Sequence, residues 1–220
     1  MSKIKDIGIV VVAAGNSSRF GEKDKLLLDL QSKPLFTHCI DTFSQIVPVE
    51  NIVVVVSEER VGELQNVIKT TLGLEIKVTP GGKQRSDSSL NGLEALPPNL
   101  EYAAVHDAAR PFLNANSFDI CYQSLKKHGS AVLAHPVTDT IKVVGKGLKV
   151  QNTPPRDTLF AAETPQMFKR QDLINAYTSK PDNVNITDEA MAMEISGHDV
   201  FLAVHEADNR KITYAKDIEK

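Results

Sequence analysis

The sequence predicts an α/β protein in which a mostly parallel, twisted sheet carries helices on both faces. Short apolar runs rich in β-branched residues alternate with longer segments of helical periodicity along most of the chain. Continuous apolar runs are typical of strands that are buried on both faces. Strands separated by helices need crossover connections, which are right-handed and cover both sides of a parallel sheet. We therefore expect residues 1–220 to form one domain, a three-layer sandwich.

The first strand, expected to end at residue 12, leads into a candidate phosphate-binding loop. Three small residues and three short polar ones follow the strand: Ala13, Ala14, Gly15, Asn16, Ser17 and Ser18. Small residues let a ligand approach the backbone, and Arg19 and Lys25 add two cations to its free N–H groups. This combination suits a polyphosphate. The spacing fits neither the P-loop nor the dinucleotide fingerprint, so an ordinary turn with solvated cations is the alternative.

The next segments continue the alternation of strand and helix. Apolar residues at helical spacing predict a helix over 34–46, with Pro34 in its first turn, and a second helix over 59–72. The run at 51–57 predicts a second buried strand, and 75–78 predicts a short third one.

A second glycine turn, Gly81-Gly82, is followed by basic and hydroxyl residues that include Lys83, Arg85 and Ser88. We expect a helix to begin after them and to cover 90–96, where prolines end it. Because helix N-termini favour anionic or polar ligand groups, this segment is a candidate second wall of the same pocket. A capped helix with a solvated lysine and arginine is the alternative.

The strand expected over 102–105 runs into His106 and Asp107. Ligands of open α/β sheets bind beyond the carboxyl ends of strands, where an aspartate can hold ribose hydroxyls or a metal ion. A turn or cap role for Asp107 is the alternative, and we expect His106 to be a packed neighbour and not a base. A helix over 117–128 and a strand over 131–137 follow.

The pattern changes at residues 138–156, which predict a polar β-hairpin instead of a further strand–helix unit. An isolated hairpin is not stable in water. We therefore expect a protruding arm that pairs with another subunit and makes a homodimer. The two prolines before Arg156 make this segment rigid and extended, and the segment presents the Arg156 cation. The segment 160–167 then returns the chain to the body, and a helix covers 170–179.

The last helix is expected to begin at Thr187 as N-cap, with Asp188 and Glu189 in its first turn and Gly197 at its end. Capping is a sufficient explanation for both acids. A strand over 200–204 leads to Asp208 and Lys211, which could serve phosphates and their metal or form a surface charge cluster.

Composition limits the partners and the compartment. The net charge of −3 argues against broad nucleic-acid or membrane-surface binding, so we expect a small-molecule partner. Cys39 and Cys121 lack metal-ligand or redox spacing and are interpreted as buried thiols in a reducing compartment. A membrane-spanning helix needs about 18 consecutive apolar residues, and no apolar run approaches this length. We expect a cytoplasmic protein.

The ordered set of segments AAGNSSRFG, GGKQRSDS, VHDAARP, PPR, ETPQ, ITDEA and ADNRKIT resembles the 2-C-methyl-D-erythritol 4-phosphate cytidylyltransferase family of nucleotidyltransferases. The resemblance covers residues 6 to about 218. Ribitol-5-phosphate cytidylyltransferases are the nearest alternative, although the AAG opening and the ITDEA and PPR segments favour the first family. A catalytically silent nucleotide-binding protein is a third reading. An NAD-dependent oxidoreductase is disfavoured because the dinucleotide fingerprint is absent.

The resemblance implies a Rossmann-like fold, a dimer made through the arm, and an isoprenoid-pathway reaction. CTP and the polyol phosphate are the implied substrates. The acceptor phosphate would attack the α-phosphorus of CTP, releasing pyrophosphate and giving a CDP-alcohol. Mg²⁺ is the implied cofactor, held mainly by the CTP phosphates, with Asp107 or Asp208 as the candidate protein ligand.

The resemblance also implies a role for each matching residue. The catalytic set is Arg19, Lys25 and Lys211, in which Lys25 is preferred to the nearby Lys23 by its spacing from Arg19. The nucleotide-binding set is Ala13, Ala14, Gly15, Asn16, Ser17, Ser18, Gly82, Ser88, Asp107 and Ala108. The acceptor-binding set is Asp107, Arg110, Thr140, Arg156, Thr164 and Thr187, in which Thr140 and Arg156 come from the partner's arm.

Overall fold

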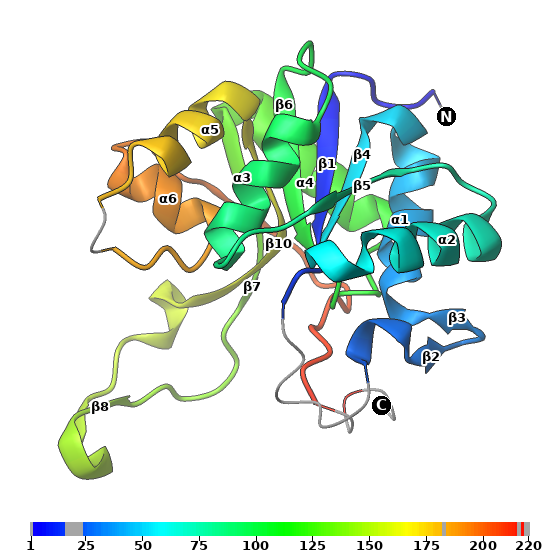
Figure 1. Ribbon diagram of the computed structural model, residues 1–220. Helices are drawn as coiled ribbons and strands as arrows, with labels where there is room; N and C mark the ends of the chain where they lie inside the picture. Colours follow the sequence, from blue (N-terminus) through cyan, green and yellow to red (C-terminus); the bar gives the residue numbers. More distant parts are fainter. Residues whose placement is uncertain (1, 16–23, 182–183, 215–216, 218–220) are drawn as a thin grey trace.

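The fold is organised by a central seven-stranded sheet of order β11-β7-β10-β6-β1-β4-β5 (Figure 1). The computed structural model describes residues 2–15, 24–181, 184–214 and 217. The predicted loop residues Asn16, Ser17, Ser18 and Arg19 lie outside this part of the chain. In order along the chain, the strands of the sheet are β1 (Ile7–Val12), β4 (Ile52–Val56), β5 (Lys77–Pro80), β6 (Tyr102–Asp107), β7 (Ser130–Pro136), β10 (Phe160–Lys169) and β11 (Leu202–Val204).

The sheet is mostly parallel, as the sequence predicted. Strand β1 pairs in parallel with β4 and β6, β4 with β5, and β11 with β7. Strand β10 is the exception, because it runs antiparallel between β6 and β7. Its pairing with β7 shifts register between Ala162 and Gln166. The return segment after the arm is therefore an inner strand of the sheet.

Helices cover both faces, which makes three layers (Figure 1). Residues of α1, α2 and α4 share one apolar core with the sheet, and residues of α3, α5 and α6 share the other. In β1, Ile9 and Val11 face the first core and Val10 the second, as the strand period of two requires. No helix in the described residues is long and apolar enough to cross a membrane. The helices are α1 (Leu35–Ile46), α2 (Val61–Leu72), α3 (Arg85–Ala95), α4 (Ala115–His128), α5 (Arg170–Thr178) and α6 (Glu189–Ile195).

Helix α3 begins five residues before the predicted start at residue 90. A capping box fixes this start: the Gln84 side chain accepts from the backbone of Asp87, and the Asp87 side chain accepts from the backbone N–H of Gln84. The polar run after Arg85 hid the helical pattern in the sequence. The consequence is that Arg85 and Ser88 belong to the first turns of a helix and not to a loop.

Helix α6 is capped by Asp188, and the prediction of Thr187 as N-cap was wrong. The Asp188 carboxylate accepts a hydrogen bond from Met191 N at 3.0 Å, which satisfies one of the free N–H groups of the first turn. The exposed Thr187 hydroxyl contacts the Met191 sulfur instead. A carboxylate at this position also interacts favourably with the positive end of the helix dipole.

A small antiparallel hairpin, β8 (Val143–Val144) with β9 (Val150–Asn152), lies within the predicted arm at 138–156. It projects away from the sheet and helices, at the lower left of Figure 1. Apolar side chains on it are exposed: Val143, Val144, Leu148 and Val150. A second two-stranded ribbon, β2 (Asp29–Leu30) with β3 (Lys33–Pro34), precedes α1.

The close approach of α3 to the sheet predicts that Gly92→Ala is destabilising. A Cβ at Gly92 would lie 2.8 Å from Cγ2 of Val55 and would also overlap the Val10 side chain. Overpacking of this kind typically lowers the free energy of unfolding by about 1–3 kcal/mol. Urea denaturation measures the change. In the control Gly62→Ala, an added Cβ meets no atom within 4 Å and should instead stabilise α2 by about 0.5–1 kcal/mol. Equal stability of Gly92→Ala and wild type would contradict this packing.

Candidate active site

The carboxyl ends of β1, β4, β5 and β6 meet at a cavity of about 580 Å³. Val12 ends β1 and Asp107 ends β6, and both line this cavity. The position is the one where open parallel sheets bind ligands, because strand ends and helix starts converge there.

The cavity brings together most of the predicted residues within the described part of the chain. The predicted nucleotide-binding residues that line it are Ala13, Ala14, Gly15, Gly82, Ser88 and Ala108. Lys25, Lys211 and Asp107, which were predicted for catalysis or binding, line it as well. The same cavity is thus lined by two loops, by the segment before α1 and by the C-terminal segment.

The second glycine turn forms a wall of the cavity together with the start of α3. A Cβ at Gly81 would lie 2.6 Å from Ser88 Oγ and 2.8 Å from the Ala14 Cβ, so the two glycine-bearing loops are in close contact. The Ser88 hydroxyl accepts from Gly82 N at 3.1 Å and donates to the Gln84 carbonyl at 3.1 Å. It therefore orders the turn that bounds the cavity. The free N–H groups of the α3 N-terminus favour an anionic or polar ligand at this wall.

The Asp107 carboxylate is paired with a cation on each oxygen. Oδ1 accepts from Arg85 Nη2 at 3.1 Å, and Oδ2 accepts from Lys211 Nζ at 2.7 Å. The Asp107 side chain is only 13% exposed, whereas 43% of the Lys211 side chain is exposed. Burial by itself raises the pKa of Asp107, but the Arg85 and Lys211 charges outweigh it and hold the pKa well below its usual range. Asp107 is therefore ionised at neutral pH.

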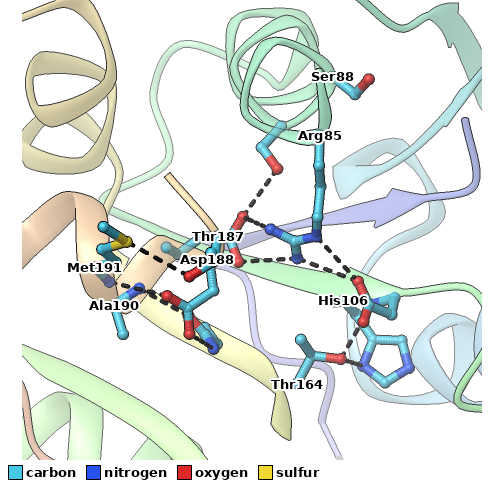
Figure 2. A network of polar contacts seen from close by, with 12 residues as sticks. Arg85, Ser88, His106, Thr164, Thr187, Asp188, Ala190 and Met191 are labelled. Atoms are coloured by element: carbon cyan, nitrogen blue, oxygen red, sulfur yellow. Dashed lines mark hydrogen bonds and ion pairs between the residues drawn. The ribbon is translucent and has the colours of Figure 1, made fainter. Parts of the chain in front are cut away.

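Thr164 and His106 fix the backbone beside this carboxylate (Figure 2). The Thr164 hydroxyl accepts from Asp107 N at 3.0 Å and lies 3.2 Å from His106 Nδ1. Thr164 is 4% exposed and does not line the cavity. His106 is fully buried, packs edge-on against Phe43 at 5.1 Å between ring centroids, and bonds the Arg110 carbonyl. His106 is a packed neighbour, as predicted.

Two further predicted residues, Arg110 and Asp208, do not line the cavity. Arg110 donates to the Asn209 carbonyl at 2.8 Å and lies 3.4 Å from the buried Glu163 carboxylate. Asp208 is exposed and pairs with Arg210. The segment 208–211 thus holds Arg110 through its backbone and contributes Lys211 to the cavity.

The remaining predicted acceptor residues lie away from the cavity. Thr140 and Arg156 are exposed on the arm, where Arg156 donates to the Thr138 carbonyl at 2.9 Å. Thr187 is exposed at the start of α6. Within one chain, the structure does not bring these three residues to the cavity.

The sequence placed Arg85 in a candidate second wall of the pocket but in neither the catalytic nor the binding set. Arg85 lines the cavity and joins Asp107 to the fully buried Glu189, whose Oε1 lies 2.9 Å from Arg85 Nη1. Interpreting Glu189 as a capping residue concealed this link, because its true partners are distant in sequence. The spacing of Arg85 and Ser89 on one face of α3 is the signal that could have indicated a shared partner, and both contact Glu189.

The described residues contain no group of three or more His, Cys, Asp or Glu side chains placed to hold a metal ion. Among the cavity-lining acids, Asp107 already has a cation on each oxygen. A Mg²⁺ ion that arrives on phosphates and keeps several waters needs only one or two carboxylates, and Asp107 is the predicted carboxylate that lines the cavity. Asp208 does not line the cavity.

A cation-bearing cavity at the carboxyl edge of a mostly parallel sheet, bounded by two small-residue turns, is typical of an α/β protein that binds a phosphorylated ligand. The chain belongs to the 2-C-methyl-D-erythritol 4-phosphate cytidylyltransferase family, whose sequence model matches residues 7–220.

Relatives of the same name are similar over nearly their whole length. The cytidylyltransferase of Alkaliphilus oremlandii is 32% identical over 99% of this chain and 94% of its own. That of Clostridioides difficile is 34% identical over 96% and 90%. A crystal structure of 4-diphosphocytidyl-2C-methyl-D-erythritol synthase from Anaerococcus prevotii covers 98% of this chain and 95% of its own, with a TM-score of 0.84 and 25% identity. The Francisella tularensis cytidylyltransferase structure covers 97% of each chain, with a TM-score of 0.80 and 27% identity.

The buried His106 predicts a loss of stability in mild acid. Burial lowers its pKa to about 4, whereas an unfolded histidine has a pKa of about 6.5. Between these values the unfolded state binds the proton and the folded state does not, so the free energy of unfolding falls as the pH drops. The loss between pH 7 and pH 5 should be about 2 kcal/mol.

Urea denaturation at both pH values measures this loss, and His106→Asn should remove it even if the variant is less stable at pH 7. Asp107 does not contribute to this window, because its pKa is lowered and its carboxylate stays ionised in both states. An unchanged pH dependence in His106→Asn would contradict the assignment.

Proposed function

We propose that this protein transfers CMP from CTP to 2-C-methyl-D-erythritol 4-phosphate, giving 4-diphosphocytidyl-2-C-methyl-D-erythritol and pyrophosphate. Membership of the family supports the reaction. The single structural observation that carries it is the cavity in which Lys25, Lys211 and Asp107 meet beside the 13–15 and 81–82 turns. A nucleoside triphosphate needs both features, because its phosphates require cations and its base requires close backbone approach.

In the proposed mechanism the protein aligns the two substrates and stabilises charge. The acceptor phosphate is ionised at neutral pH, so one of its oxygens can attack the α-phosphorus of CTP without a protein nucleophile. The bond from the α-phosphorus to the bridging oxygen breaks, and pyrophosphate leaves with the electron pair. Lys25 and Lys211, with Arg19 from outside the described residues, neutralise the charge that builds on the transferring and leaving groups.

The proposed role of Asp107 follows from its surroundings. Its charge is balanced by Arg85 and Lys211, so it accepts hydrogen bonds at the cavity wall without repelling a phosphate strongly. We assign it to the hydroxyl groups of ribose or of the acceptor. Mg²⁺ bound mainly by the CTP phosphates would supply further charge neutralisation, with Asp107 as the protein carboxylate that could hold it.

The proposed enzyme is a homodimer in which the arm at 138–156 reaches the partner's site. The exposed apolar side chains of the arm, which include Leu148 at 81% exposure, would be covered by a second copy. Thr140 and Arg156, which lie away from the cavity of their own chain, would then bind the acceptor phosphate of the partner.

Pyrophosphate release with CTP and Mg²⁺ tests the function, with 2-C-methyl-D-erythritol 4-phosphate and D-ribitol 5-phosphate assayed in parallel. Turnover with the first acceptor alone is expected. Turnover with ribitol phosphate would keep the mechanism and replace the substrate. CTP binding without release on either acceptor would refute the enzyme and leave a silent nucleotide-binding protein.

Lys25→Ala should lower kcat by about 10²- to 10³-fold while raising the KM for CTP much less, because a preorganised cation acts mainly on the transition state. Steady-state kinetics with CTP as the varied substrate measure the split. Lys23→Ala is the matched control two residues away and should keep near wild-type kcat. A rise in KM alone would make Lys25 only a binding residue.

Arg156→Ala should chiefly raise the KM for the acceptor, because the arm supplies a cation for its phosphate. If the site is shared, mixing the Lys25→Ala and Arg156→Ala proteins should recover activity in heterodimers, since one of the two sites then carries both native residues. Homodimers of each variant, assayed separately, are the control. Absence of any recovery after subunit exchange would count against a shared site.

A further inference from the structure

Glu189 carries a fully buried carboxylate. Its two oxygens accept hydrogen bonds from three other residues. Its Oε1 accepts from Arg85 Nη1 at 2.9 Å, Ser89 Oγ at 2.8 Å and Tyr177 Oη at 2.8 Å, and its Oε2 accepts from Arg85 Nη2 at 3.1 Å. Burial raises the pKa of the Tyr177 hydroxyl well above its usual value, and the Glu189 charge raises it further. Tyr177 therefore remains a neutral donor.

Capping does not explain this arrangement. The side chain that caps α6 is Asp188, which bonds Met191 N, while the amide of Ala190 donates to Gln166 Oε1 at 2.8 Å. The Glu189 carboxylate instead contacts Arg85 and Ser89 of α3 and Tyr177 of α5. A buried carboxylate is costly unless it is paired, so its presence here requires the Arg85 charge.

The Arg85 guanidinium forms hydrogen bonds to carboxylates on two of its edges (Figure 2). Nη1 and Nη2 face Glu189, while Nε and Nη2 face Asp107 Oδ1 at 3.3 and 3.1 Å. Burial lowers the pKa of Arg85, but the Glu189 and Asp107 charges outweigh it and keep it above its usual value. A planar group held along two edges has one orientation, so Glu189 determines which edge Arg85 offers to Asp107.

We propose that Glu189 is a positioning residue of the active site: it orients Arg85, which holds the Asp107 carboxylate toward the cavity and Lys211. Four charges of alternating sign, Glu189, Arg85, Asp107 and Lys211, then run from the core to the cavity. Glu189 does not line the cavity, so it acts only through Arg85. This inference rests on the proposed function for its kinetic test, but its geometry does not.

Glu189→Gln tests the proposal, because glutamine has nearly the same shape but lacks the charge that orients Arg85. We expect kcat/KM to fall about 10- to 100-fold, as when the hydrogen-bond partner that orients a metal ligand is removed. Glu194→Gln is the matched control: it is the same substitution at an exposed position of α6 and should keep wild-type activity. Glu189→Asp keeps the charge with a shorter reach and should recover part of the loss. Circular dichroism establishes the folded fraction of each variant before assay.

A double-mutant cycle with Arg85→Gln separates positioning from loss of structure. If Glu189 acts through Arg85, Glu189→Gln should lower kcat/KM little further in the Arg85→Gln background. A full additional loss there, or wild-type kcat/KM in Glu189→Gln alone, would overturn the proposal.

A crystal structure of Glu189→Gln decides the same question without turnover. Departure of Arg85 from Asp107, or a shifted Asp107–Lys211 pair, is the expected result. Retention of both contacts at the wild-type 3.1 and 2.7 Å would overturn the inference. If wild-type protein released no pyrophosphate with any acceptor, the proposed function would fail on its own, and this comparison would still test Glu189.

Discussion

The balance of charge around Asp107 is the interaction on which the rest of the site depends. A carboxylate this deeply buried is tolerated only when cations and hydrogen bonds compensate for lost hydration. Helix α3 supplies Arg85, the C-terminal segment supplies Lys211, and strand β10 supplies the Thr164 hydroxyl that accepts from the Asp107 amide. Elements far apart in the chain are thereby fixed around the end of β6.

The two cations that balance Asp107 differ in how freely they can move. Arg85 is held by a second, buried carboxylate, whereas the Lys211 side chain is 43% exposed and has Asp107 as its acid partner in the described residues. Because Asp107 is buried, withdrawing Lys211 from it would be costly. An ammonium group has three N–H donors, so Lys211 can contact a phosphate oxygen while it keeps Asp107. On the proposed function, Arg85 is the fixed part of the wall and Lys211 is the part that meets substrate.

The fold and the cavity walls were predictable because local patterns in the sequence determine them. Continuous apolar runs indicated the strands of the parallel sheet, and the small residues at 13–15 and 81–82 indicated two turns that the structure places at the cavity wall. The antiparallel direction of β10 and the early start of α3 were not predictable, since the first depends on tertiary pairing and the second on a capping box in a polar run. Glu189 was misread because a local cap accounted for it, while its partner Arg85 lies 104 residues away in the sequence.

The placement of the acceptor residues bears on whether one chain makes a complete site. The cavity contains Lys25 and Lys211, two of the cations proposed for the triphosphate, but Thr140 and Arg156 lie on the projecting arm, where Arg156 donates to the Thr138 carbonyl. Two short strands with apolar side chains in water lack a core that could hold them in place. On the proposed homodimer, burial against a second copy would order the arm, and that copy would bring the matching cavity with it. Acceptor binding and arm packing would then be one event, because each supplies part of the free energy that orders the other.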